Sequence, residues 1–193
     1  MDENKAILLK WLKYLMYLHI ASLGLSAVNV FVRIETLTTA VGLAISIGAA
    51  ACLLQLRHVN PRYQKSAVVR SIMIGCILAV SLLGGPVLLT NVGSVCAFVA
   101  DYQEYHGHGE MVEKTSRSLA QKWNSLFLWA LAVGLISGFA VSAVVMIGAV
   151  AGAEVDTLTV IAAVAVLLAN AVIDVLYLRN MKNTLAVLET EEM

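Results

Sequence analysis

Apolar residues occupy this chain in long runs, and short polar breaks divide the runs into segments. Most of these segments are near or above the roughly 20 residues that an α-helix needs to cross a bilayer. The pattern therefore predicts an all-α fold, a polytopic integral membrane helical bundle with six transmembrane helices arranged as three hairpins. The predicted spans are residues 6–32, 37–56, 62–83, 87–102, 123–150 and 158–178.

The number of spans depends on one break in an apolar run, at Gly84, Gly85 and Pro86. Glycine tolerates the backbone angles of a tight turn, and proline is favoured in the first turn of a helix, so we expect the chain to reverse there. Two alternatives stay open, a single long helix over residues 71–102, which gives five spans, and a re-entrant hairpin over the same residues. The segment 87–102 would be only about 24 Å long as a helix, against a hydrocarbon core of ~30 Å.

Basic residues favour six spans over five. With a turn at residues 84–86, every basic cluster falls on one side of the membrane. With a single span over residues 71–102, the charges of three loops or ends disagree with the positive-inside rule. We therefore predict that both termini are cytoplasmic. The clusters contain Lys5, Lys10, Lys13, Arg57, Arg62, Lys65, Arg70, Lys114, Arg117, Lys122, Arg179 and Lys182.

Aromatic residues gather near the same predicted interface, as in the aromatic belt of a membrane protein. The expected belt consists of Trp11, Tyr14, Tyr17, Tyr63, Tyr102, Tyr105, Trp123, Trp129 and Tyr177.

Composition agrees with a membrane protein, since 60% of the residues are hydrophobic and only 13% are charged. A soluble domain has about a quarter of its residues charged. We expect a single membrane domain over residues 1–193 whose main partner is the lipid bilayer. The formal net charge is zero, so nothing in the charge favours a nucleic-acid partner.

Ionisable residues at membrane depth are the main candidates for a binding site. His19, Arg70, Asp101 and Asp174 lie about 14 to 18 residues from the predicted outer turns, which is roughly 21 to 27 Å along a helix. Asn170 lies one turn from Asp174 on the same face. These groups either pair for structural reasons or line a cytoplasm-facing pocket for a small polar ligand or an ion.

A second candidate site is the pair of histidines at positions 106 and 108. With Glu104, His106 and His108 provide the ligand types of a zinc or other transition-metal site. The alternating glycines predict that the fourth helix breaks at residues 106–109, which makes this segment a flexible polar loop, and that residues 110–122 form a polar helix of their own.

Catalytic chemistry has no recognisable motif in this chain, so we expect a protein that is not an enzyme and that needs no cofactor. Small residues recur at helical spacing, as in Gly134, Gly138 and Ser142, and such stripes let helices approach closely within a homo-oligomer or against a membrane protein partner.

In length, six-helix count and cytoplasmic termini, the chain is similar to the membrane-embedded substrate-binding subunits of energy-coupling-factor vitamin transporters. It also resembles small polytopic proteins of bacterial inner membranes. This resemblance is one of architecture, and no residue role is carried over from it. The sequence leaves two functional hypotheses, a transport, channel-type or substrate-binding component with a cytoplasm-side polar pocket, and a noncatalytic accessory or oligomeric subunit.

Overall fold

Long helices make up nearly all of the part that the structure describes, which is residues 3–31, 35–151 and 156–190 of this computed structural model. In these residues there are six α-helices, one 3-10 helix and no strand, which confirms the all-α prediction. The predicted outer turns at residues 33–36 and 151–156 lie largely outside the described residues. The elements are α1 (Glu3–Phe31), α2 (Glu35–Gln55), η1 (Leu56–His58), α3 (Pro61–Leu83), α4 (Val87–Val112), α5 (Arg117–Ala151) and α6 (Asp156–Thr190).

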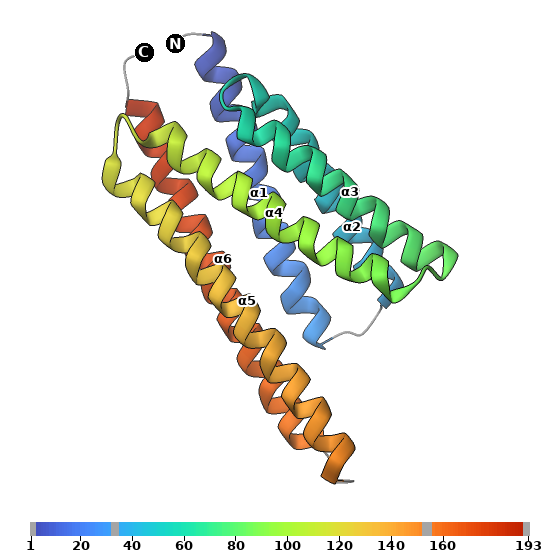
Figure 1. Ribbon diagram of the computed structural model, residues 1–193. Coiled ribbons are helices and arrows are strands. Elements are labelled where there is room, and N and C mark those ends of the chain that lie inside the picture. Colours follow the sequence, from blue (N-terminus) through green and yellow to red (C-terminus); the bar gives the residue numbers. More distant parts are fainter. Residues whose placement is uncertain (1–2, 32–34, 152–155, 191–193) are drawn as a thin grey trace.

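Consecutive helices pack side by side, and α6 returns against α1, so the contacts between helices form a closed ring (Figure 1). Helix α4 also contacts α6. The start of α1 lies beside the end of α6, where Lys13 Nζ is 2.9 Å from Glu189 Oε1. The α2–α3 and α4–α5 connections lie at this same end of the bundle, which we call the terminal end (Figure 1).

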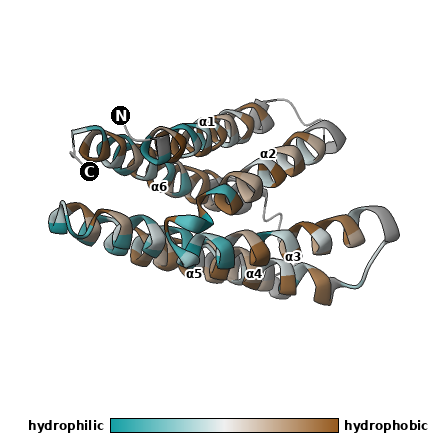
Figure 2. Ribbon diagram, turned by 90° about the horizontal axis from the view of Figure 1, so that it is seen from above, coloured by the Kyte–Doolittle hydropathy of each residue, from teal (hydrophilic) through white to brown (hydrophobic). Residues whose placement is uncertain are grey.

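Five of the described helices are long and apolar enough to cross a membrane. Large apolar side chains face outward along them, and apolar residues dominate the helices away from the terminal end (Figure 2). These features indicate a membrane protein. Helix α4 is not among the five. The candidate spans are Asn4–Val28, Thr38–His58, Pro61–Ser81, Arg117–Phe139 and Val164–Thr190.

The chain turns at residues 84–86, between α3 and α4. Gly84 adopts the left-handed conformation with a φ of 60°, as glycine commonly does where a helix ends, and Gly85 N donates to Ala79 O at 3.3 Å. Pro86 is extended and precedes the first residue of α4. Because α3 and α4 then pack along each other, residues 71–102 are not one continuous helix.

The predicted break of the fourth helix at residues 106–109 is wrong, since α4 continues to Val112. Both glycines lie where another chain segment approaches closely. A Cβ atom on Gly107 would be 3.1 Å from Tyr63 Cε1, and one on Gly109 would be 3.4 Å from Ala120 O. These glycines therefore serve the packing of α4 against α3 and α5 rather than a turn.

The predicted polar helix over residues 110–122 is also wrong. Helix α4 ends at Val112, and α5 begins at Arg117 and continues without a break through the predicted span 123–150. The turn between the two helices is closed by Ser116 N, which donates to Val112 O at 2.7 Å.

The glycines of the predicted small-residue stripe have different surroundings. A Cβ atom on Gly134 would be 2.8 Å from Phe98 Cζ, so the small size of Gly134 already serves a contact between α5 and α4. Gly138 has no other described atom within 4 Å of such a Cβ position.

Close packing is concentrated toward the terminal end of the bundle. Among the described residues, none of α1 after Leu15, of α5 after Leu126 or of α6 before Ile173 is buried. Four of the nine aromatic residues expected in an interfacial belt are buried in this core instead, because they pack on one another and on polar groups. They are Tyr63, Tyr105, Trp123 and Tyr177.

Candidate functional site

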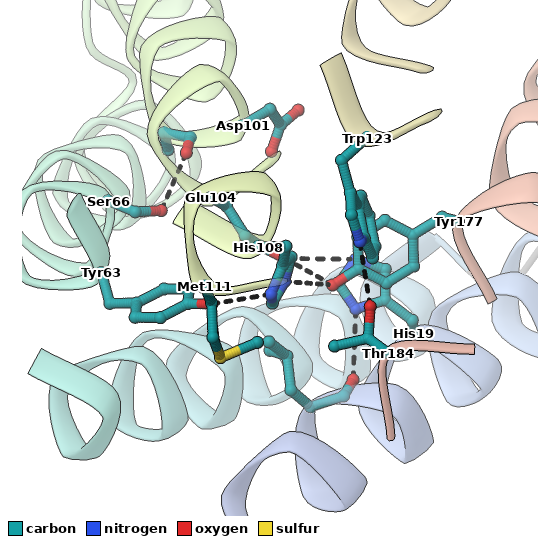
Figure 3. Close-up of polar contacts among 12 residues, drawn as sticks. His19, Tyr63, Ser66, Asp101, Glu104, His108, Met111, Trp123, Tyr177 and Thr184 are labelled. Atoms are coloured by element: carbon teal, nitrogen blue, oxygen red, sulfur yellow. Dashed lines mark hydrogen bonds and ion pairs between the residues drawn. The ribbon is translucent and has the colours of Figure 1, made fainter. Parts of the chain in front are cut away.

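A buried carboxylate, Glu104 on α4, is the centre of the largest polar group in the core. Its side chain is 1% exposed. Arg70 on α3 donates from Nη2 to Glu104 Oε2 at 2.8 Å, and Tyr177 on α6 donates from its hydroxyl to Glu104 Oε1 at 2.6 Å. Three helices thus meet at one charged side chain. Figure 3 shows the Glu104 and Tyr177 side chains of this group.

Arg70 joins this buried carboxylate to a more accessible one. The same Nη2 atom lies 3.0 Å from Asp101 Oδ1, and the Asp101 side chain is 48% exposed. The guanidinium is therefore shared between two carboxylates, and its buried Nε donor has no partner among the described residues.

His108 lies one turn after Glu104 on α4 and is completely buried. Its Nδ1 atom is 2.8 Å from the Tyr63 hydroxyl, and its Nε2 atom is 3.4 Å from the Tyr177 hydroxyl and 3.8 Å from Glu104 Oε1. The imidazole therefore connects two buried tyrosines beside the carboxylate.

His19 brings α1 into the same group. Its ring stacks on the Tyr177 ring with centroids 3.9 Å apart, and its Nε2 atom is 3.9 Å from Glu104 Oε1. The Nδ1 atom of His19 lies 3.2 Å from Leu15 O. Since a carbonyl only accepts, Nδ1 carries the proton in that contact, and Nε2 of the neutral ring is left to accept a proton near Glu104.

Seven side chains thus form one connected polar group, which we call the Glu104 cluster. Its members are His19, Tyr63, Arg70, Asp101, Glu104, His108 and Tyr177.

Helix α5 supports the cluster through Trp123, whose ring contacts His108, Tyr105 and Tyr177. The Trp123 Nε1 atom donates to Thr184 Oγ1 at 3.0 Å, and both residues are completely buried (Figure 3). This aromatic packing fixes the orientation of the rings that contact Glu104.

Glu104 is ionised at neutral pH. It lies beyond the predicted span 87–102 and outside the five candidate spans. Burial alone would raise the pKa of its carboxyl, but the Arg70 guanidinium holds that pKa well below its usual range. The cluster therefore contains a permanent buried ion pair.

Of the five residues predicted to bind a ligand, the structure brings His19, Arg70 and Asp101 together in the cluster. Asp174 lies at its edge, partly buried, where its charge acts on Asp101 and Tyr105. Asn170 is exposed, and its side chain donates to Val166 O of its own helix at 3.0 Å. Asn170 therefore has no hydrogen bond with the other four.

The three residues proposed as metal ligands separate into two environments. Glu104 and His108 belong to the cluster, whereas the Nδ1 atom of His106 contacts Tyr102 O at 3.0 Å and its ring packs on Tyr102 and Phe127. No group of three His, Cys, Asp or Glu side chains in the described residues has a geometry that could hold a metal ion.

Sequence reasoning assigned Tyr63, Tyr177 and Trp123 to the membrane interface and did not single out Thr184. A signal for Tyr177 was present, because it lies three residues after Asp174 and shares a helix face with it. Glu104 and His108 likewise have the four-residue spacing of one helix face, but the expected helix break concealed it.

Comparisons with known protein families, with curated proteins and with solved structures found nothing that matches this chain. The fold and the five long apolar helices indicate the class, a helical membrane protein, here with a buried charged cluster.

Proposed function

We propose that this chain is a transport-type membrane component whose Glu104 cluster binds a proton or a small cation. The alternative, a noncatalytic accessory or oligomeric subunit, would give these ionisable groups a structural role only. His19 and Arg70 of the cluster lie within candidate spans, and ionisable side chains in such segments commonly mark ion pathways and proton relays.

The charge count of the cluster carries this proposal. One arginine, Arg70, faces two carboxylates, Asp101 and Glu104. Unbalanced charge is costly in a medium of low dielectric constant, so one further positive charge would complete the site. A proton or a small cation held beside Glu104 Oε1 would supply it, and the Nε2 atoms of His19 and His108 both lie within 4 Å of that oxygen.

We propose that the proton or cation reaches the cluster through Asp101, the more exposed of its two carboxylates. From there, hydrogen bonds lead through Arg70 to Glu104 and on to Tyr177. A positive charge that binds at Asp101 would therefore change the interaction of Arg70 with Glu104, because the Arg70 guanidinium is shared between the two carboxylates.

The membrane topology that goes with this proposal has six spans, with α4 as the short fourth one, and cytoplasmic termini in a bacterial inner membrane. The gathering of basic residues at the terminal end supports it. The proposed site then opens toward the cytoplasm.

Accessibility labelling tests this topology at Lys114, an exposed residue of the α4–α5 turn. In a chain whose three cysteines are replaced by alanine, Lys114→Cys is expected to resist a membrane-impermeant thiol reagent in intact cells and to react after the cells are broken. Labelling in intact cells would place the turn outside and rule out six spans with cytoplasmic termini.

Proton uptake tests the proposed site. Purified protein in detergent is taken from about pH 8 to pH 5, the range in which histidine titrates, and the protons bound are counted with an indicator dye. Glu104→Gln keeps the shape of the side chain but removes its charge. We expect this variant to bind about one proton fewer per chain than the wild type, because a neutral site attracts a proton less.

Glu110→Gln is the matched control, since it removes a carboxylate from the same helix outside the cluster. Burial would raise the pKa of Glu110, but hydrogen bonds from Asn60 and Arg62 lower it, so Glu110 stays ionised through most of this range. Equal proton uptake by the wild type and Glu104→Gln would refute a proton site.

In proteoliposomes with an enclosed dye, only the wild type and the control should pass protons along an imposed pH gradient.

A further inference from the structure

A groove between α5 and α6 lies on the outside of the bundle and is separate from the Glu104 cluster. It has a volume of about 550 Å³. Its residues follow one another at helical spacing along both helices, so each helix gives one continuous face to the groove. They include Lys122, Leu126 and Trp129 of α5, and Leu176, Arg179, Asn180 and Asn183 of α6.

The lining of this groove changes from polar to apolar along its length. Lys122 and Asn183 lie toward the terminal end, whereas Trp129 and Leu176 lie farther along the bundle. Lys122 and Trp129 are seven residues apart on α5, which corresponds to about 10 Å along the helix. Hydrophilic residues of α5 and α6 gather toward the terminal end (Figure 2). A ligand that fits this lining has a polar head and an apolar tail.

Asn180 indicates that the groove is built to hold a polar group. The residue is only 7% exposed, yet its side chain has no hydrogen bond with any described residue. Its amide atoms are not sealed from the surface, so what exposure they have is toward the groove that Asn180 lines. A buried amide without a partner is unfavourable, and a bound acceptor would satisfy it.

Two cations lie beside this amide. Neither Lys122 nor Arg179 forms an ion pair or hydrogen bond with the described part of the chain. Arginine and lysine are the side chains that most often bind phosphate groups. Their position beside an exposed Trp129, a residue type enriched at the membrane interface, places the cations at headgroup level.

We propose that this groove binds an anionic phospholipid, with the phosphate between Lys122, Arg179 and Asn180 and an acyl chain against Leu126, Trp129 and Leu176. Two unpaired cations favour a headgroup of net negative charge over a zwitterionic one, whose amine they repel. The lipid belongs to the leaflet at the terminal end of the bundle.

The test compares phosphatidylglycerol with phosphatidylcholine, added to the full chain in detergent, by counting bound lipids with native mass spectrometry. The wild type is expected to bind phosphatidylglycerol more tightly. The double variant Lys122→Gln/Arg179→Gln should weaken that binding roughly 30-fold, since each cation near a lipid surface contributes about a factor of five. Both side chains are exposed, so the variant is expected to fold.

Lys65→Gln/Lys114→Gln is the matched control, because it removes two exposed cations away from the groove. If this control loses as much affinity as the groove variant, or if both lipids bind the wild type equally, the proposed site is wrong. Inorganic phosphate is tested alone in the same way. Phosphate binding as tight as that of phosphatidylglycerol would show that the groove recognises a soluble anion and would overturn the lipid assignment.

Discussion

Arg70→Met is expected to lower the free energy of unfolding by about 3–5 kcal/mol, because it leaves the Glu104 carboxylate buried without its counter-ion. Methionine keeps much of the apolar volume of the arginine stem, so the loss reports mainly on the charge. The measurement is equilibrium unfolding in mild detergent with a denaturing co-solvent, followed by circular dichroism.

Adding Glu104→Gln to Arg70→Met should recover a large part of this loss. A neutral amide in place of the carboxylate removes the unpaired charge and still accepts the hydrogen bond from Tyr177. Lys65→Met serves as the control, since Lys65 is an exposed cation on the same helix. If Arg70→Met were no more destabilising than Lys65→Met, the ion pair would not contribute to the fold.

Gly107→Ala is the second substitution with a large expected effect, a loss of about 1–3 kcal/mol of stability. The added methyl group would be 3.1 Å from Tyr63 Cε1. The Tyr63 ring has little freedom to move, because it is completely buried and its hydroxyl contacts His108 Nδ1 at 2.8 Å.

Gly24→Ala is the control for Gly107→Ala, since a Cβ atom on Gly24 meets nothing within 4 Å among the described residues. Replacing an unconstrained helical glycine with alanine normally stabilises a helix by roughly 0.5–1 kcal/mol. The two variants should therefore shift the unfolding midpoint in opposite directions. Stabilisation by Gly107→Ala would contradict the close packing of α4 against α3.

The helices could be predicted from the sequence because their apolar runs are long and their ends carry local signals. Pro61 begins α3, with the Asn60 side chain accepting from Arg62 N at 2.9 Å, and the glycines at residues 84–85 end that helix. Such signals act over a few residues, and a sequence displays them directly. The side of the membrane on which each turn lies stays a prediction.

The centre of the candidate site could not be predicted in the same way. Depth alone grouped His19, Arg70 and Asp101, but it gave no means of deciding which neighbour each would contact. Glu104 was assigned to a metal site beside the flexible loop predicted at residues 106–109, because the alternating glycines there are helix breakers by propensity. Tertiary packing overrides this helix-breaking tendency, since α3 approaches α4 closely at Gly107 and α5 approaches it closely at Gly109.

The confinement of close packing to one half of the bundle has a mechanical consequence. Helices α1, α5 and α6 are clamped near Leu15, Leu126 and Ile173, and beyond those residues their described side chains are not buried. Each helix is then held in place near one end only, and the Glu104 cluster lies where the helices are held. A small change of charge at the Glu104 cluster would therefore give a larger displacement at the far ends of these helices, where the described side chains are not buried.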